Sequence, residues 1–188
     1  MKKVAVFFPG IGYTNDKPLM YYSRKLAEKA GYEVKQLTFS GFPKKDKSNE
    51  KKMQKSFEIA LQQSQEQLEE IPWDQYDEVL FIGKSIGTAA AAEMAHKLKR
   101  PARMVLYTPL EQTFQHPLED AIAFTGSADP WVPQGRIPEL CAERKIPCHN
   151  VEQGNHSLET GDWKTDLETI RQVMTEVEAF ILRRSRSL

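Results

Sequence analysis

Residues 79–87 read Val-Leu-Phe-Ile-Gly-Lys-Ser-Ile-Gly, a continuous apolar run that leads into a Gly-x-Ser-x-Gly motif. The run 79–82 is typical of a strand that is buried on both faces of a sheet. Residues 86–98 predict a helix that begins with small residues, including the run 89–92. The motif therefore lies at a sharp strand-to-helix turn, where small neighbours leave room for a strained and exposed serine, Ser85.

Short apolar runs alternate with amphipathic stretches on both sides of this motif. The runs predict five further strands, at residues 4–8, 33–39, 104–107, 121–124 and 148–151. Apolar residues at helical spacing predict four further helices, at about residues 19–30, 53–68, 137–144 and 167–181. Strands that alternate with helices imply a parallel sheet with helices on both faces. We therefore expect one three-layer, doubly wound α/β domain over residues 1–188, with a mainly parallel six-stranded sheet.

The composition is that of an ordinary globular protein and argues against several classes of function. The 188 residues are 40% hydrophobic and 28% charged, with 26 basic and 26 acidic residues and a formal net charge of zero. This balance argues against a nucleic-acid partner, whose binding surface is strongly basic. Two cysteines, Cys141 and Cys148, are too few for a disulfide framework and suit a reducing compartment. Neither a secretory signal nor an apolar run of about 18 residues occurs, so we expect a cytoplasmic protein without a membrane partner.

Two further motifs supply the partners that a catalytic serine needs, namely a base and a carboxylate that orients the base. Asp129 follows the strand predicted at 121–124, and His156 follows the strand predicted at 148–151. Both share with Ser85 a place at the carboxyl end of a strand, the edge where open α/β sheets hold their sites. The order Ser, Asp, His along the chain is the one that this architecture uses. We expect a nucleophilic serine, a histidine base and an orienting aspartate.

Other interpretations of these residues stay open. The glycine-serine turn could instead bind a phosphate or pack against the sheet, and Asp129 could serve only to initiate the turn at Pro130. His116, in the loop after the fourth predicted strand, is the main rival for the role of base. We expect His96, within a helix, to lie at the surface and His149, within a strand, to be structural.

The stretch Phe8-Pro9-Gly10-Ile11-Gly12 follows the first predicted strand. In a doubly wound sheet the first and third strands lie side by side, so we expect this loop next to Ser85. Its glycines let the backbone approach a ligand closely. The backbone amides of Ile11 and of Ile86, the residue after the serine, are the predicted donors to a tetrahedral oxyanion. A simple tight turn after the strand is the alternative.

Together these motifs resemble those of small α/β-hydrolases that have no cap domain, close to esterases and dienelactone-hydrolase-like proteins. The resemblance covers essentially the whole chain. It rests on the Gly-Lys-Ser-Ile-Gly elbow at 83–87, on Gly-Ser-Ala-Asp-Pro-Trp-Val-Pro at 126–133 and on Gly-Asn-His-Ser-Leu-Glu at 154–159. Two positions depart from the family's pattern. Pro9 replaces the histidine of a His-Gly-x-Gly-type oxyanion loop, and Lys84 is an unusual neighbour for the nucleophile.

The resemblance implies a serine hydrolase that cleaves a carboxylic ester or thioester through an acyl-enzyme, without a metal or a cofactor. Carried over residue by residue, it makes Ser85 the nucleophile, Asp129 the acid and His156 the base. The expected partner is a small-molecule ester or thioester. Two alternatives stay open, namely an acyltransferase that uses the same triad and a non-catalytic interaction protein that keeps the hydrolase fold.

The connection at residues 108–120 is too short for a lid domain, so we expect an open site. Phe42, Phe114 and Trp131 are candidates for its apolar wall, with a place in the core as the equal alternative. The lysine-rich loop Lys44–Lys47 could attract an anionic substrate, although a solvated loop is the favoured interpretation.

Overall fold

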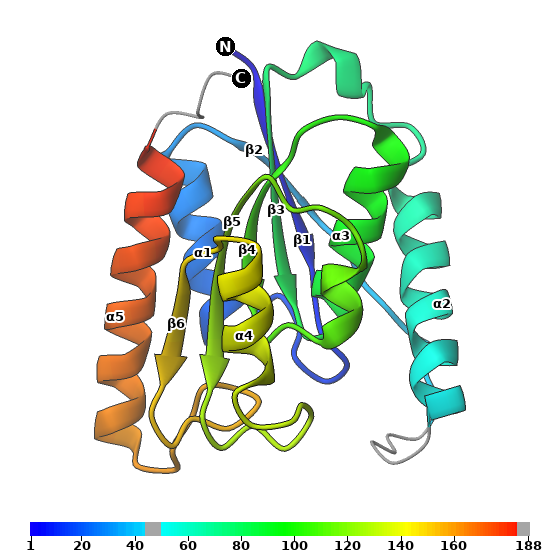
Figure 1. Ribbon diagram of the computed structural model, residues 1–188. Coiled ribbons are helices and arrows are strands. Elements are labelled where there is room, and N and C mark those ends of the chain that lie inside the picture. The colour runs from blue at the N-terminus through cyan, green and yellow to red at the C-terminus, as the bar shows by residue number, and fades with distance from the viewer. Residues whose placement is uncertain (44–49, 184–188) are drawn as a thin grey trace.

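The computed structural model describes residues 1–43 and 50–183, and in them six strands form one sheet (Figure 1). The strands are β1 Lys3–Phe8, β2 Glu33–Gln36, β3 Glu78–Lys84, β4 Arg103–Tyr107, β5 Asp120–Gly126 and β6 Cys148–Val151. Their spatial order is β2-β1-β3-β4-β5-β6, and every neighbouring pair is parallel. The doubly wound, six-stranded sheet predicted from the sequence is confirmed, and it is parallel throughout.

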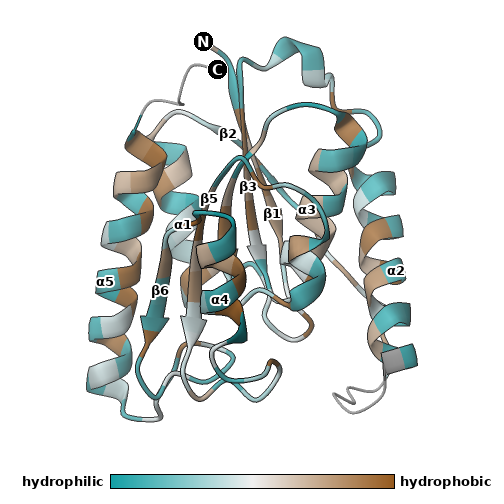
Figure 2. Cartoon of the chain, viewed as in Figure 1, coloured by the Kyte–Doolittle hydropathy of each residue, from teal (hydrophilic) through white to brown (hydrophobic). Residues whose placement is uncertain are grey.

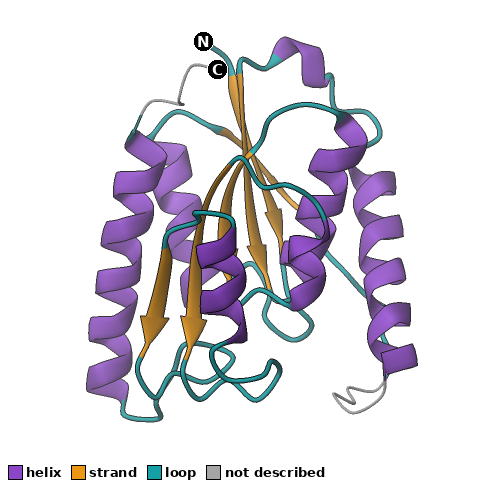
Figure 3. Cartoon of the chain, viewed as in Figure 1, coloured by secondary structure: helices purple, strands orange, loops and turns teal. Residues whose placement is uncertain are grey.

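Five α-helices of the described residues cover the two faces of this sheet (Figure 3). They are α1 Pro18–Lys29, α2 Glu50–Leu68, α3 Ile86–Leu98, α4 Arg136–Glu143 and α5 Trp163–Leu182. Two short 3-10 turns lie at Trp73–Gln75 (η1, between α2 and β3) and Glu111–Gln115 (η2, between β4 and β5). α1 and α5 pack together on one face, whereas α2, α3 and α4 cover the other (Figure 1). This is the three-layer arrangement that alternating strands and helices imply.

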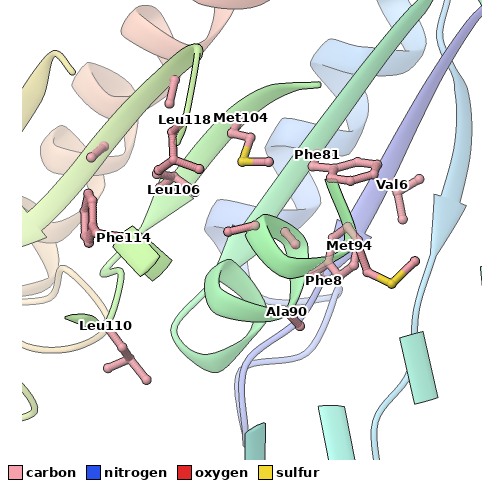
Figure 4. Close-up of a cluster of buried hydrophobic side chains, with 14 of the residues drawn as sticks. Val6, Phe8, Phe81, Ala90, Met94, Met104, Leu106, Leu110, Phe114 and Leu118 are labelled. Atoms are coloured by element: carbon pink, nitrogen blue, oxygen red, sulfur yellow. The ribbon is translucent and has the colours of Figure 1, made fainter. Parts of the chain in front are cut away.

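Side chains of the central strands alternate between two apolar cores, one on each face of the sheet. In β1, Val6 and Phe8 belong to the core under α2 and α3, whereas Ala5 and Phe7 belong to the core under α1 and α5. Figure 4 shows part of the first core. In Figure 2 the long helices α2 and α5 carry both hydrophobic and hydrophilic residues, because only one face of each helix packs on an apolar core.

Several element boundaries differ from those predicted, among them the end of β2 and the start of α5. β2 ends at Gln36 rather than at residue 39, although the Leu37 amide still donates to the Phe7 carbonyl at 3.0 Å. α5 begins at Trp163 rather than at residue 167, because the Asp162 carboxylate accepts a hydrogen bond from the Thr165 amide at 2.9 Å and caps the helix. The loop Lys44–Lys47 lies outside the described residues. No helix among residues 1–43 and 50–183 is long and apolar enough to cross a membrane.

The carboxyl ends of all six strands meet at one edge of the sheet, the lower edge in Figure 1. β1 and β3 are neighbours there, with Phe8 level with Gly83. The chain order reverses at this pair, since β2 lies outside β1 and β4 to β6 lie beyond β3. The loops after β1 and β3 therefore adjoin at the switch point, the place where sheets of this kind bind ligands.

Candidate active site

Ser85 occupies the sharp turn between β3 and α3. Its backbone has φ 55° and ψ −123°, a region that residues with a side chain rarely adopt. Such a conformation costs about 1–3 kcal/mol and persists only where the surroundings enforce it. The turn brings Ser85 to the carboxyl edge of the sheet, where its side chain is partly exposed while its neighbours Lys84 and Ile86 are buried.

The two glycines of the motif are required by space around this turn. A Cβ atom added to Gly87 would overlap the Phe8 carbonyl oxygen and lie 2.6 Å from that of Pro9. A Cβ added to Gly83 would lie 2.7 Å from the Cα of Thr88. Gly-x-Ser-x-Gly is therefore the sequence that allows α3 to turn back against the ends of β1 and β3.

The structure brings together the three residues that the sequence singles out, Ser85, Asp129 and His156. His156 Nε2 lies 2.7 Å from Ser85 Oγ, and His156 Nδ1 lies 2.7 Å from Asp129 Oδ2. The Asp129 side chain is 1% exposed, and its Oδ1 accepts a hydrogen bond from the Trp131 amide at 2.9 Å. A carboxylate only accepts, so it fixes the imidazole proton on Nδ1 and leaves Nε2 to accept from the serine hydroxyl.

Direct hydrogen bonds hold the loops after β5 and β6 together. The Ala128 amide donates to the Gly154 carbonyl at 3.0 Å, and the Gln153 amide donates to Ser127 Oγ at 2.7 Å. Within the second loop, Asn155 Oδ1 accepts the amide of Ser157 at 2.7 Å and closes a turn around the histidine. These contacts explain how two loops far apart in the sequence present an aspartate and a histidine at hydrogen-bonding distance.

Comparison with known proteins shows the family of this chain. The sequence profile of the family described as "Alpha/beta hydrolase domain" matches residues 1–182. The chain belongs to the alpha/beta-hydrolase family. No protein of curated function is detectably similar in sequence to this hydrolase.

Solved structures of other alpha/beta hydrolases share its fold. An esterase from Pyrococcus furiosus has a TM-score of 0.65 at 13% identity, over 96% of this chain and 82% of that one. Est1E from Butyrivibrio proteoclasticus has a TM-score of 0.65 at 9% identity, over 97% of this chain and 89% of that one. An alpha-beta serine hydrolase homologue from Coxiella burnetii has a TM-score of 0.58 at 15% identity, over 93% of this chain and 84% of that one. At these identities the likeness concerns the fold.

The loop after β1 borders the serine of this hydrolase. The Gly10 amide donates to the Tyr13 carbonyl at 3.0 Å, which forms a tight turn with Ile11 near its tip. A Cβ added to Gly10 would lie 3.2 Å from the Lys84 carbonyl oxygen and 3.4 Å from the Cβ of Ser85, so glycine gives this loop room beside the serine turn. Ile86 begins α3, where the first backbone amides have no partner within the helix. Ile11 and Ile86 both line the pocket at Ser85. This is the position that the role predicted for their amides, as donors to an oxyanion, requires.

A pocket of about 100 Å³ lies at Ser85 and adjoins a groove of about 640 Å³. Trp131 lines both, and the centroid of its ring lies 5.5 Å from that of His156. Met53 of α2 and Leu110, before η2, also line both spaces. The sequence assigned Met53 only to the apolar face of a helix and gave no signal for Leu110.

The other two candidates for the apolar wall, Phe42 and Phe114, are not among the described residues that line either space. Phe114 is 4% exposed and belongs to the core, because the η2 turn directs its side chain inward (Figure 4). Arg144 stacks its guanidinium over that ring at 5.5 Å. Phe42 is half-buried and packs edge-on against Phe39, with ring centroids 6.3 Å apart.

The rival histidine has partners on α3 instead. His116 Nε2 lies 2.6 Å from Glu93 Oε2, and its ring stacks on that of His96 with centroids 4.0 Å apart. His149 stacks on Phe124 with centroids 5.1 Å apart. Within residues 1–43 and 50–183, no three His, Cys, Asp or Glu side chains are grouped closely enough to hold a metal ion.

Proposed function

We propose that this alpha/beta hydrolase cleaves a carboxylic ester or thioester through an acyl-enzyme on Ser85. One observation carries the proposal: the continuous hydrogen-bond chain from Ser85 through His156 to the buried Asp129, with both distances 2.7 Å. The fold it shares with the Pyrococcus furiosus esterase adds support.

In the first half of the reaction, Ser85 Oγ attacks the carbonyl carbon while His156 Nε2 takes the hydroxyl proton. The carbonyl oxygen becomes an oxyanion, which the amides of Ile11 and Ile86 stabilise by hydrogen bonds. Asp129 keeps the imidazole in the required tautomer and stabilises its charged form. The intermediate then breaks its bond to the leaving oxygen or sulfur, which receives the proton from His156.

In the second half a water molecule takes the place of the leaving group. His156 Nε2 accepts a proton from that water as its oxygen attacks the acyl carbon, and the same oxyanion forms again. Collapse breaks the bond to Ser85 Oγ, which recovers its proton from the imidazole. The products are a carboxylic acid and an alcohol or thiol, and the enzyme returns to its starting state.

Labelling with a fluorophosphonate probe tests the nucleophile directly. The probe should label the wild-type protein and leave Ser85→Ala unlabelled, since the phosphorus atom bonds to Ser85 Oγ. Ser40→Ala is the matched control, because Ser40 is an exposed serine outside the site, and it should be labelled like the wild type. Equal labelling of Ser85→Ala would overturn the assignment, and no labelling of any form would favour a non-catalytic interaction protein.

Ester hydrolysis with added alcohols separates a hydrolase from an acyltransferase. Both use the same acyl-enzyme and differ only in what attacks it. A hydrolase should release free acid in the presence of the alcohols, whereas a transferase should release mainly the new ester.

A further inference from the structure

The first inference concerns the pocket at Ser85 and the groove beside it, and it rests on the proposed function. The pocket of about 100 Å³ and the groove of about 640 Å³ share part of their lining. Three residues line both: Met53, Leu110 and Trp131. A substrate bound to Ser85 can therefore place one part in the pocket and another in the groove.

The size of the pocket limits the part that it can hold. An apolar cavity of about 150 Å³ accommodates benzene, with its six carbon atoms. A space of about 100 Å³ accordingly holds roughly four carbon atoms by the same measure. Gly10, Ile11 and Gly12 of the β1 loop border it, so it lies beside the predicted oxyanion donors.

The chemistry decides which part of the substrate occupies the groove. His156 Nε2 must give its proton to the leaving oxygen or sulfur, so the leaving group lies beside that imidazole. His156 itself lines the pocket, and its neighbour Trp131, with ring centroids 5.5 Å apart, lines both spaces, whereas the β1 loop with the predicted oxyanion donors lines only the pocket. The groove therefore opens from the histidine side of the pocket. Val132 and Leu110 add apolar surface there, while α2 contributes polar side chains such as Gln54.

We propose that the substrates are esters or thioesters of short acyl groups, of about two to four carbons, with large leaving groups that have an apolar body. The acyl group occupies the pocket beside Ser85. The leaving alcohol or thiol lies in the groove between α2 and the segment that contains Trp131.

Two ester series test this assignment with the intact protein. Nitrophenyl esters keep the leaving group constant, and kcat/KM should fall about 10-fold or more between butyrate and octanoate, which does not fit the pocket. Acetates of ethanol, phenethyl alcohol and naphthylethanol have leaving groups of similar basicity, and kcat/KM should rise along that series.

A matched pair of variants locates the leaving group. Gln54 and Gln62 are both exposed on α2 and each bonds a glutamate four positions later, but only Gln54 lines the groove. Gln54→Trp should remove the preference for naphthylethyl acetate, while Gln62→Trp should behave as wild type with every ester. A preference for octanoate that Gln54→Trp abolishes would overturn the proposal, because the groove would then hold the acyl chain. Absence of both hydrolysis and probe labelling would instead overturn the proposed function.

The second inference concerns Lys84, whose side chain is fully buried although lysine normally keeps its ammonium group in water. Lys84 Nζ donates to Thr108 Oγ1 at 2.6 Å and lies 5.0 Å from the centroid of the Tyr13 ring. Burial raises the pKa of Tyr13 to about 12, so this ring carries a neutral phenol at ordinary pH. The ammonium thus links the end of β3 to the loop after β1 and to the end of β4.

A second hydrogen bond continues the link to the catalytic histidine. Thr108 Oγ1 lies 3.1 Å from the carbonyl oxygen of His156. An ammonium group only donates, so the hydroxyl accepts from Lys84 and gives its own proton to that carbonyl. Thr108 itself has φ 40°, a value that is unusual for a β-branched residue. Its amide donates a hydrogen bond to the Phe124 carbonyl oxygen at 2.7 Å.

We infer that Lys84 is a positioning residue that acts through Thr108 to fix the backbone of His156 relative to Ser85. The role requires a hydrogen-bond donor at Lys84 and a hydroxyl at Thr108 that accepts and donates at once. It explains why the position before the nucleophile holds a lysine.

Thr108 offers the sharpest test, because the hydroxyl can be removed or kept with little change in volume. Thr108→Val should lower kcat about 10-fold or more with KM nearly unchanged, since a small displacement of a catalytic group costs about 10²-fold. Thr108→Ser should restore most of kcat. Lys84→Met should match Thr108→Val, and the double variant should be little worse than either single one, as expected for residues that act in one chain.

Ser23→Ala is the control for lost stability alone. It removes a buried 2.7 Å hydrogen bond to Tyr107 on the α1 face of the sheet, so thermal unfolding should move to lower temperature while kcat stays at the wild-type value. A wild-type kcat in Thr108→Val, or equal losses in Thr108→Val and Thr108→Ser, would overturn the inference. The Thr108 pair decides the matter even if Lys84→Met does not fold.

Discussion

Gly126, the last residue of β5, packs backbone against backbone on Gly154 in the loop after β6. A Cβ atom added to Gly126 would overlap the Gly154 carbonyl group and lie 2.8 Å from the carbonyl oxygen of Asn155. The loops that carry Asp129 and His156 begin at this contact. The distance between those two side chains therefore depends on the absence of a single methyl group.

Gly126→Ala should push the two loops apart. Overpacking of this kind costs about 1–3 kcal/mol, and kcat for ester hydrolysis should fall in the protein that remains folded, because Asp129 moves away from His156. Urea unfolding and kcat measure the two effects separately. Gly135→Ala is the control, with φ +80° and nothing within 4 Å of an added Cβ. It should lose stability through backbone strain and keep its activity, and a wild-type kcat in Gly126→Ala would contradict the argument.

Asp129→Asn keeps the shape of the side chain and removes its charge. The amide can present an N–H to His156 Nδ1, which favours the tautomer that cannot accept the Ser85 proton. By analogy with other triads, kcat should fall about 10⁴-fold with the fold intact. Circular dichroism and hydrolysis rates check both parts. Asp74→Asn changes an exposed aspartate and should have no effect, whereas an unchanged rate in Asp129→Asn would exclude the residue from this role.

The position of the candidate site could be predicted because sequence distance matters little at the edge of a parallel sheet. Ser85, Asp129 and His156 each follow a strand, and every strand ends at the same edge. The apolar runs that define the strands therefore determine where these side chains meet. The glycines at 83 and 87 mark the turn because no larger residue fits there.

The pocket walls could not be predicted in the same way, because they depend on the direction of single side chains. Phe114 follows β4 just as the site loops follow their strands, but the 3-10 turn that contains it directs its ring into the core. Lys84 was notable only as an unusual neighbour of the serine. Its burial depends on Thr108 and Tyr13, which lie far from it in the sequence and come close only in the folded sheet.

Arg103 should matter for stability and not for chemistry. It lies at the amino end of β4, opposite the site, and its side chain is 5% exposed. Its guanidinium is 2.7 Å from Glu78 Oε1 and 3.1 Å from Asp120 Oδ2. Arg103→Met removes the cation that Glu78 and Asp120 share, although Asp120 keeps its ion pair with Arg183. Breaking a buried pair in this way costs about 3–5 kcal/mol.

Urea unfolding measures that loss, and kcat of the folded variant should equal the wild-type value. Arg171 provides the comparison, since it pairs with Glu168 at 2.6 Å but is 67% exposed. Arg171→Met should cost far less than Arg103→Met, because an ion pair in water contributes little to stability. Similar losses for the two variants would show that burial of the Arg103 pairs contributes nothing.

Tyr13 should make the folded state less stable at high pH. It is 8% exposed, and burial raises the pKa of its phenol from 10.0 to about 12. The unfolded chain releases this proton above pH 10, whereas the folded chain retains it until about pH 12. The contribution of Tyr13 to stability is therefore complete below pH 10 and is lost as the pH rises to about 12. Tyr13→Phe should flatten the fall in unfolding free energy over this range. Tyr22→Phe, at a 49% exposed position, should leave the pH dependence of the unfolding free energy unchanged. A wild-type pH dependence in Tyr13→Phe would contradict the prediction.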